Sequence, residues 1–68
     1  MNWIAVAAGV LVLPTTKFRI VYTRHADRAD TFDLTWDGGI ATEFPTLPIA
    51  KLAAQEKMND LIGMGLEV

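Results

Sequence analysis

The residues with the clearest chemical potential lie in the stretch IVYTRHADRAD, residues 20–30. There the only histidine of the chain, His25, stands between Arg24 and Arg28 and ahead of two aspartates. A histidine in such surroundings can act as a nucleophile or as a general acid or base, and arginines can bind a phosphate group. The same residues would also suit a charged loop between two strands, in which opposite charges pair locally. The flanking elements decide between the two interpretations.

The segment FRIVYTRHADR resembles the signature of the histidine phosphatase superfamily, which includes the phosphoglycerate mutases. In that family an apolar strand runs into Arg-His-Gly, and the histidine is the phosphorylated nucleophile. The resemblance implies a phosphate-binding role for Arg24 and a nucleophilic role for His25. It ends after these two residues, because Ala26 stands where the family has glycine and the second histidine of the family's phosphate pocket has no counterpart in this chain. We therefore interpret TRHADRAD, residues 23–30, as a charged loop with a solvated histidine.

The segments on either side of this loop alternate between apolar and polar residues, which is typical of strands with one buried face. The residues expected on that face are Phe18, Ile20, Tyr22, Phe32, Leu34 and Trp36. The sequence Asp37-Gly38-Gly39 then predicts a hairpin turn, because glycine accepts the positive φ of tight turns. We expect a further strand from Ile40 to Phe44, with Ile40, Thr42 and Phe44 on one face. These strands would form an antiparallel meander.

The run WIAVAAGVLVLP, residues 3–14, contains no charged residue. No basic residue precedes it, as one would in a signal peptide, and it is shorter than the roughly 20 residues of a membrane-spanning helix. Its valines favour a strand, whereas its alanines permit a helix. We expect one bent strand from Ile4 to Leu13 with the bend at Gly9, and a helix is the alternative.

The C-terminal third has the pattern of a helix. Thr46 is a good N-cap, and Gly63 is expected to end the helix. The apolar stripe between them is Leu47, Ala50, Ala54, Met58 and Leu61. Residues 64–68 would be a tail or a last edge strand. The predicted fold is a single small α+β domain, residues 1–68, in which one C-terminal helix packs across one face of a three- to four-stranded antiparallel sheet. The predicted core is Phe18, Ile20, Leu34, Trp36, Phe44, Leu47, Ala54, Met58 and Leu61.

Composition excludes several kinds of chemistry. The 68 residues include no cysteine and no serine, so disulfides, thiolate metal sites and the commonest nucleophiles are absent. The aspartates do not follow the spacing of a calcium-binding loop, and no glycine-rich loop precedes a helix. The formal net charge of −2 gives no basic patch for nucleic acid. We therefore expect a cytoplasmic protein that is not an enzyme and that holds no metal or cofactor.

Binding to another protein is the function that these observations favour. Motif-free proteins of this size often belong to phages and other mobile elements, where they inhibit a host protein by stoichiometric binding. A homo-oligomeric small subunit is one alternative. A nucleic-acid-binding sheet is another, with these stacking and phosphate-binding residues: Tyr22, Trp36, Arg19, Arg24 and Arg28. Because tyrosine, tryptophan and arginine are enriched at interface hot spots, the predicted contacts combine charged residues with two aromatic anchors: Arg24, Arg28, Asp30, Asp33, Asp37 and Glu43, with Trp3 and Tyr22.

Overall fold

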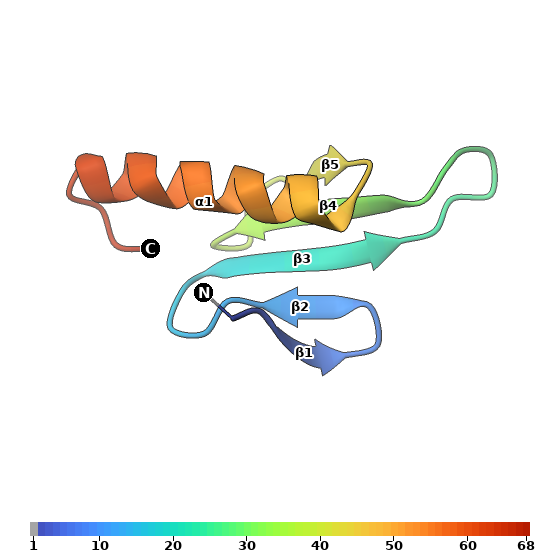
Figure 1. Cartoon of the computed structure of the whole chain (residues 1–68), viewed down its shortest axis with the longest axis horizontal. Coiled ribbons are helices and arrows are strands. Elements are labelled where there is room, and N and C mark those ends of the chain that lie inside the picture. Colours follow the sequence, from blue (N-terminus) through green and yellow to red (C-terminus); the bar gives the residue numbers. More distant parts are fainter. Residues whose placement is uncertain (1) are drawn as a thin grey trace.

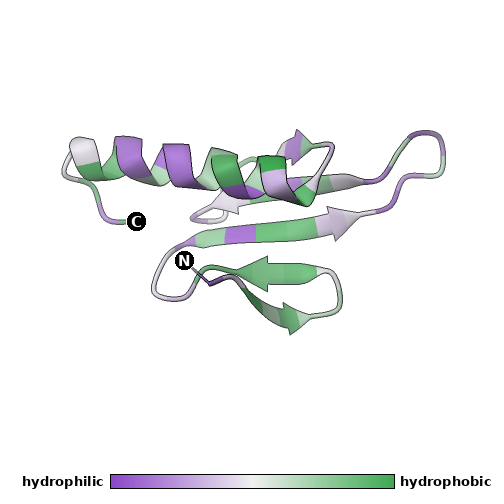
Figure 2. Cartoon of the chain, in the orientation of Figure 1, coloured by the Kyte–Doolittle hydropathy of each residue, from purple (hydrophilic) through white to green (hydrophobic). Residues whose placement is uncertain are grey.

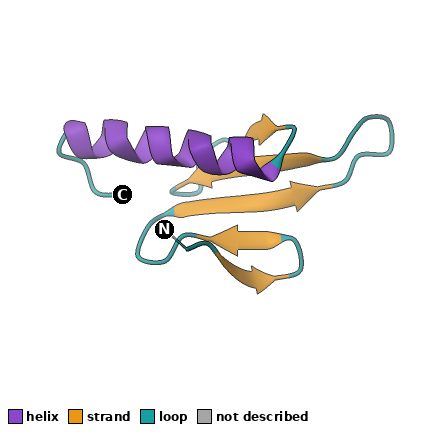
Figure 3. Cartoon of the chain, viewed as in Figure 1, coloured by secondary structure: helices purple, strands orange, loops and turns teal. Residues whose placement is uncertain are grey.

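The computed structural model describes residues 2–68, which form five strands and one helix (Figures 1 and 3). All five strands belong to one antiparallel sheet, in which they lie side by side in sequence order. The prediction of an antiparallel α+β meander with a C-terminal helix is confirmed, but the sheet has five strands rather than three or four. The elements are β1 (Ile4–Ala7), β2 (Val10–Val12), β3 (Phe18–Thr23), β4 (Thr31–Trp36), β5 (Thr42–Phe44) and α1 (Leu47–Gly63).

The additional strand comes from the N-terminal apolar run, which folds as a hairpin of β1 and β2 rather than as one bent strand. Gly9 has φ of 73° and lies in the turn, because glycine adopts this left-handed conformation without a steric penalty. The carbonyl of Gly9 accepts a hydrogen bond of 2.8 Å from the N–H of Tyr22, which ties the turn to β3. Val6 is an extra residue on β1 and forms a bulge. The strand conformation was predicted correctly, but at Gly9 the chain reverses its direction instead of only bending.

The long central strands β3 and β4 pair in the register that their alternation predicts. Phe18 lies opposite Trp36 and Ile20 lies opposite Leu34, so the apolar residues of both strands share one face. Phe18 and Ile20 are each only 1% exposed, whereas Arg19, on the other face, is exposed. The predicted assignment of the two faces is therefore confirmed.

The turn after β4 forms as predicted, but the strand that follows is shorter. Asp37 and Gly38 have φ of 56° and 70°, the positive values of a tight hairpin turn. The ladder resumes only at Thr42, which lies opposite Leu34. Ile40 is 98% exposed and lies outside the sheet, so the prediction of a strand that starts at Ile40 was wrong. The reason is that the chain runs through residues 37–41 before it returns to pair with β4.

Helix α1 begins as predicted. The Thr46 side chain accepts a hydrogen bond of 3.4 Å from the N–H of Ile49 and so caps the first turn. The left-handed residue beyond the C-terminus is Gly65, with φ of 75°, rather than Gly63. The N–H of Gly65 donates a hydrogen bond to the Ile62 carbonyl, and the N–H of Leu66 donates one to the Leu61 carbonyl. This pair of hydrogen bonds is a Schellman motif. The helix therefore includes Gly63, and the prediction of its last turn was two residues too short.

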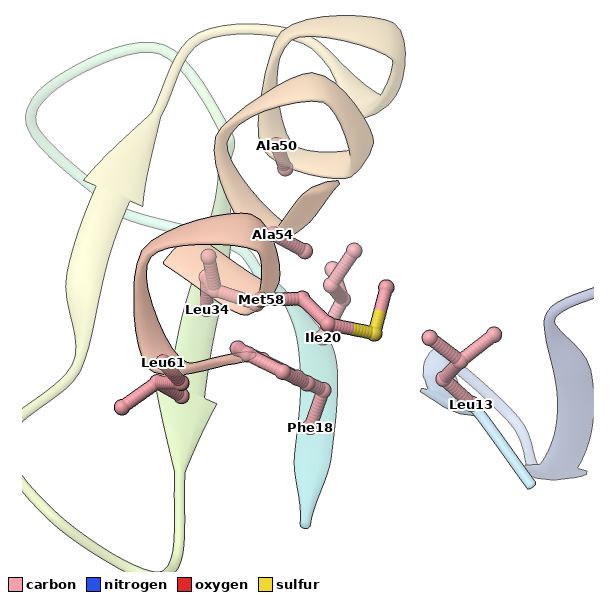
Figure 4. Packing of buried hydrophobic residues seen from close by; sticks show 8 residues of the cluster. All are labelled: Leu13, Phe18, Ile20, Leu34, Ala50, Ala54, Met58 and Leu61. Carbon is pink, nitrogen blue, oxygen red and sulfur yellow. The ribbon is translucent and has the colours of Figure 1, made fainter. Parts of the chain in front are cut away.

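The core lies between α1 and the central strands (Figure 4). Small alanines on the buried stripe of the helix, Ala50 and Ala54, let it approach the sheet closely, and both are almost fully buried. Residues 64–68 form a tail, and the main-chain oxygen of Val68 accepts a 2.6 Å hydrogen bond from the N–H of Lys17. Six residues of the predicted core are buried: Phe18, Ile20, Leu34, Ala54, Met58 and Leu61. Leu13 and Ala50, which were not in the predicted core, are buried with them. The other three predicted core residues are half-buried and pack against this cluster: Trp36, Phe44 and Leu47.

The helix covers only part of the sheet. It contacts β4 and β5, and its buried side chains reach β3, whereas the β1–β2 hairpin lies on the far side of β3 from the helix (Figure 1). Figure 2 shows this hairpin as hydrophobic along its whole length. All four residues of β1 are exposed. One half of the sheet is therefore a two-layer structure, and the other half is a single layer.

Candidate functional site

Six of the eight predicted contact residues lie at the end of the sheet where residues 24–30 join β3 to β4. This segment projects beyond the sheet (Figure 1). Three side-chain contacts hold it against the strands, one each from Tyr22, His25 and Arg28. We call residues 24–30 the clasped loop. The predicted contact residues in it or beside it are Tyr22, Arg24, Arg28, Asp30, Asp33 and Glu43.

The first contact is a bidentate ion pair between the loop and β5. The guanidinium of Arg28 donates two hydrogen bonds, of 2.8 and 2.7 Å, to the two carboxylate oxygens of Glu43. This planar geometry is specific to arginine and carboxylate. The hydrogen bonds raise the pKa of Arg28 and lower the pKa of Glu43 below its ordinary value. Both side chains are about half exposed, at 51% and 42%, so solvent screens the pair and its main effect is to orient the loop.

The second contact overturns the prediction of a solvated histidine. The His25 side chain is only 16% exposed, because the loop folds it onto the sheet. Its Nε2 lies 2.9 Å from the hydroxyl oxygen of Thr31 and 3.8 Å from a carboxylate oxygen of Glu43. The Thr31 hydroxyl donates its own hydrogen to Asp33, at 2.8 Å, so it can only accept from His25. The Nε2 atom therefore carries the hydrogen in this arrangement and offers no lone pair.

Asp33 holds the strand ends together beneath the loop. Its two carboxylate oxygens accept hydrogen bonds from Thr23, at 2.7 Å, and from Thr31. Across the sheet Asp33 lies opposite Glu43, and two carboxylates in this position repel each other. The threonine hydroxyls on one carboxylate and Arg28 on the other offset this repulsion. Asp33, predicted as a partner contact, thus has a structural role in the isolated chain.

The third contact lies at the opposite face of the loop. The hydroxyl of Tyr22 donates a hydrogen bond to the carboxylate of Asp30, and this bond raises the pKa of the tyrosine because it stabilises the protonated form. The Tyr22 ring packs against that of Phe32, with 5.3 Å between the ring centroids. Tyr22 remains 39% exposed. It therefore anchors the loop and also presents aromatic surface.

The two remaining predicted residues lie elsewhere. Asp37 occupies the β4–β5 turn at the other end of the strands, where its carboxylate is 3.7 Å from the ammonium of Lys17. Trp3 is half-buried and lines a small cavity with Leu13 and Met58 beside the helix. The fold therefore brings six of the predicted contact residues together and separates the other two from them.

The residues considered for nucleic-acid binding are also dispersed. Tyr22 and Trp36 lie on the helix side of the sheet, whereas Arg19 lies on the opposite face. The ammonium groups of Lys17 and Lys57 each lie 5.8 Å from the centroid of the Trp36 ring. Its indole N–H is buried and has no hydrogen-bond partner among the described residues. These positions do not form one stacking platform of the kind that single-stranded nucleic acid needs.

Sequence reasoning missed an apolar groove on the helix side of the sheet. The groove has a volume of about 480 Å³ and lies where α1 does not cover the strands. The signal that could have revealed it is the absence of charge from residue 3 to residue 16, which leaves both faces of the hairpin apolar. The lining residues are Ala5, Ala7, Gly9, Val10, Leu11, Ile20, Tyr22 and Phe32.

Neither a metal site within the described residues nor a relative of the chain is found. Within residues 2–68 there is no group of three or more His, Cys, Asp or Glu side chains that could hold a metal ion. No helix in the same range is long and apolar enough to cross a membrane. The chain matches no protein-family model, no curated protein and no solved structure.

Proposed function

We propose that the chain is a non-enzymatic module that binds another protein stoichiometrically through the clasped loop. The observation that carries the proposal is the threefold attachment of this loop, through Arg28 to Glu43, Tyr22 to Asp30 and His25 to Thr31. A loop that only connected two strands would need none of these contacts. A loop that is ordered before binding loses less conformational entropy when a partner arrives.

The composition of the loop suits a protein interface. Arg24 and Asp27 are exposed within it, and the partly exposed ring of Tyr22 lies at its base. Arginine and tyrosine are enriched among the residues that dominate binding energy, and charges of both signs set the register of a partner. We expect Arg24, Asp27 and Tyr22 to make the direct contacts, while Asp33 and Glu43 hold the loop in shape.

The chemistry of the loop supports binding over catalysis. The nucleophile that the phosphatase resemblance implies would need an accessible His25, but this side chain is only 16% exposed, its Nε2 donates to Thr31, and Glu43 is engaged by Arg28. The chain offers no serine or cysteine as a substitute. Inhibition of a host protein by a phage or mobile-element accessory protein is the specific use that we propose, because such a module acts by occupying a surface rather than by turnover.

The test is a binding measurement with matched charge reversals. The immobilised chain is exposed to a cell lysate, and a captured protein is then purified and its binding measured at several salt concentrations. Asp27→Lys changes the charge of the loop without touching its three attachments, and Asp60→Lys makes the same change on the exposed side of α1. We expect Asp27→Lys to alter the association rate and its salt dependence, as charges at an interface rim do, and Asp60→Lys to leave both unchanged. Equal behaviour of the two variants would place the interface elsewhere.

A further inference from the structure

The outer edge of β1 is an unprotected strand edge. β1 is the first strand of the sheet, so half of its main-chain N–H and C=O groups point away from β2. Its sequence, Ile-Ala-Val-Ala, contains no charge and no proline, and all four residues are exposed. Natural proteins protect such edges with lysine, proline or a covering segment, because an open edge pairs readily with another strand. Here only the bulge at Val6 disturbs the edge.

The sequence of the hairpin is that of an interior strand pair. Strands that are apolar on both faces are normally buried on both faces, whereas a half-exposed strand alternates between apolar and polar residues. β3 and β4 alternate, but β1 and β2 consist only of Ile, Ala, Val and Leu. Ile4 and Val6 are 50% and 56% exposed in the single chain. A single copy of the chain therefore leaves partly exposed a pair of strands whose sequence is typical of buried strands.

We propose that a second copy of the chain occupies this open edge, by antiparallel pairing of β1 with the partner's β1 about a two-fold axis near Ala5 and Val6. Antiparallel pairing of a strand with itself is compatible with this symmetry, since each copy presents the same edge to the other. The five strands of each copy then join into one continuous sheet. An axis perpendicular to the sheet places both helices on the same face, so the two apolar grooves meet between them.

The absence of charge favours a second copy as the occupant. The first charged residue of the chain is Lys17, so two copies with a net charge of −2 each can meet at β1 without like charges facing each other. A different partner would find no charged group at this edge with which to select its register, whereas self-pairing needs none. The small size of the core adds a reason, because its eight buried residues include two alanines and a short chain gains stability by association.

The first test is the mass in solution, measured by light scattering over a range of concentrations. The wild-type chain should approach twice the 7.5 kDa of one copy as concentration rises. Val6→Lys places two like charges next to each other at the proposed axis, and the dissociation constant should rise by about tenfold or more. Thr42→Lys, at the opposite edge strand, is the matched control and should leave the mass unchanged. A wild-type monomer at all concentrations would overturn the proposal, as would a dimer that Val6→Lys leaves intact.

The second test does not depend on how well a lysine is tolerated in β1. The chain has no cysteine, so single cysteines can report on proximity without background. Val6→Cys should give a covalent dimer with a short thiol crosslinker, and the Thr42→Cys control should stay monomeric. Crosslinking of Leu52→Cys, on the exposed side of α1, in place of Val6→Cys would move the interface to the helix and overturn the proposal. Both outcomes are independent of the clasped loop.

Discussion

At one edge of the sheet β5 carries Glu43, is followed by Pro45 and lies beside the helix, whereas at the other edge β1 has only exposed, uncharged residues. The Glu43 side chain is engaged by Arg28 from the clasped loop, so the charge on the β5 edge strand also orders the loop. The two edges belong to one sheet of five strands, yet only one of them is protected against pairing.

The difference shows where this small chain places its polar groups. Its side-chain hydrogen bonds concentrate at β3, β4 and the loop that joins them, and they attach the projecting loop to the strands. The N-terminal hairpin instead has an apolar surface and free strand edge. We propose the first region as the site of a partner recognised through charge, and the second as the site of a partner recognised through its main chain.

The largest effect should come from truncating the covered part of the sheet. Phe18→Ala removes a side chain that is 1% exposed and should cost about 3–5 kcal/mol of unfolding free energy. Ile4→Ala removes a side chain that is 50% exposed and should cost about 1 kcal/mol or less in the monomer. Urea denaturation at low protein concentration measures both. Equal losses of unfolding free energy would show that the hairpin is as well packed as the core, and would contradict the difference between the two halves of the sheet.

A smaller effect is expected at His25. His25→Ala removes the hydrogen bond to Thr31 from a largely buried side chain and should cost about 1 kcal/mol. Arg24→Ala, in the same loop but exposed, should stay within about 0.5 kcal/mol of the wild type. Thermal or chemical unfolding compares the two variants. An unchanged free energy of unfolding in His25→Ala would show that this side chain is solvated, as the sequence predicted.

The attachment of the loop to β5 should depend on pH. Arg28 lowers the pKa of Glu43 below its ordinary value of 4.5, so the pair contributes stability that is complete above that value and is lost as pH falls through the lowered pKa. Over this range the NMR signals of the Arg28 side chain and of residues 24–30 should shift together. Glu43→Gln should abolish this coupled transition, and its persistence in the variant would assign the transition to another carboxylate.

The smallest effect is expected at Ile40. This residue is 98% exposed in the β4–β5 turn, so Ile40→Ser should change the unfolding free energy by less than about 0.5 kcal/mol. It should also leave the mass in solution unchanged, because the turn is remote from β1. A marked destabilisation would mean that Ile40 belongs to the sheet, as its sequence position first suggested.

The parts of the fold that could be predicted from sequence are those specified by local pattern. The alternation in β3 and β4 fixed their buried faces, and Thr46 with the stripe from Leu47 to Leu61 located the helix. The hairpin at Gly9 was harder to predict, because two alanines precede Gly9 and no polar turn residue marks it. The start of β5 was missed because Asp37-Gly38 indicates a turn but not the length of chain before the ladder resumes.

The candidate site was predictable in composition but not in its contacts. Arg28 and Glu43 are 15 residues apart, and only the return of β5 beside β4 brings them together. His25 appeared solvated because nothing in the local sequence shows that the loop folds back onto Thr31. Asp37 was grouped with the loop because it is near in sequence, although β4 carries it to the other end of the sheet.

We thus propose β1 as an open edge that a second copy closes, whereas Glu43 and the following Pro45 protect the edge at β5. Amide hydrogen exchange resolved by residue, at low and high protein concentration, tests this directly. Protection of residues 4–7 should increase with concentration, while protection of residues 42–44 should stay constant. Protection of residues 4–7 that is the same at both concentrations would contradict it.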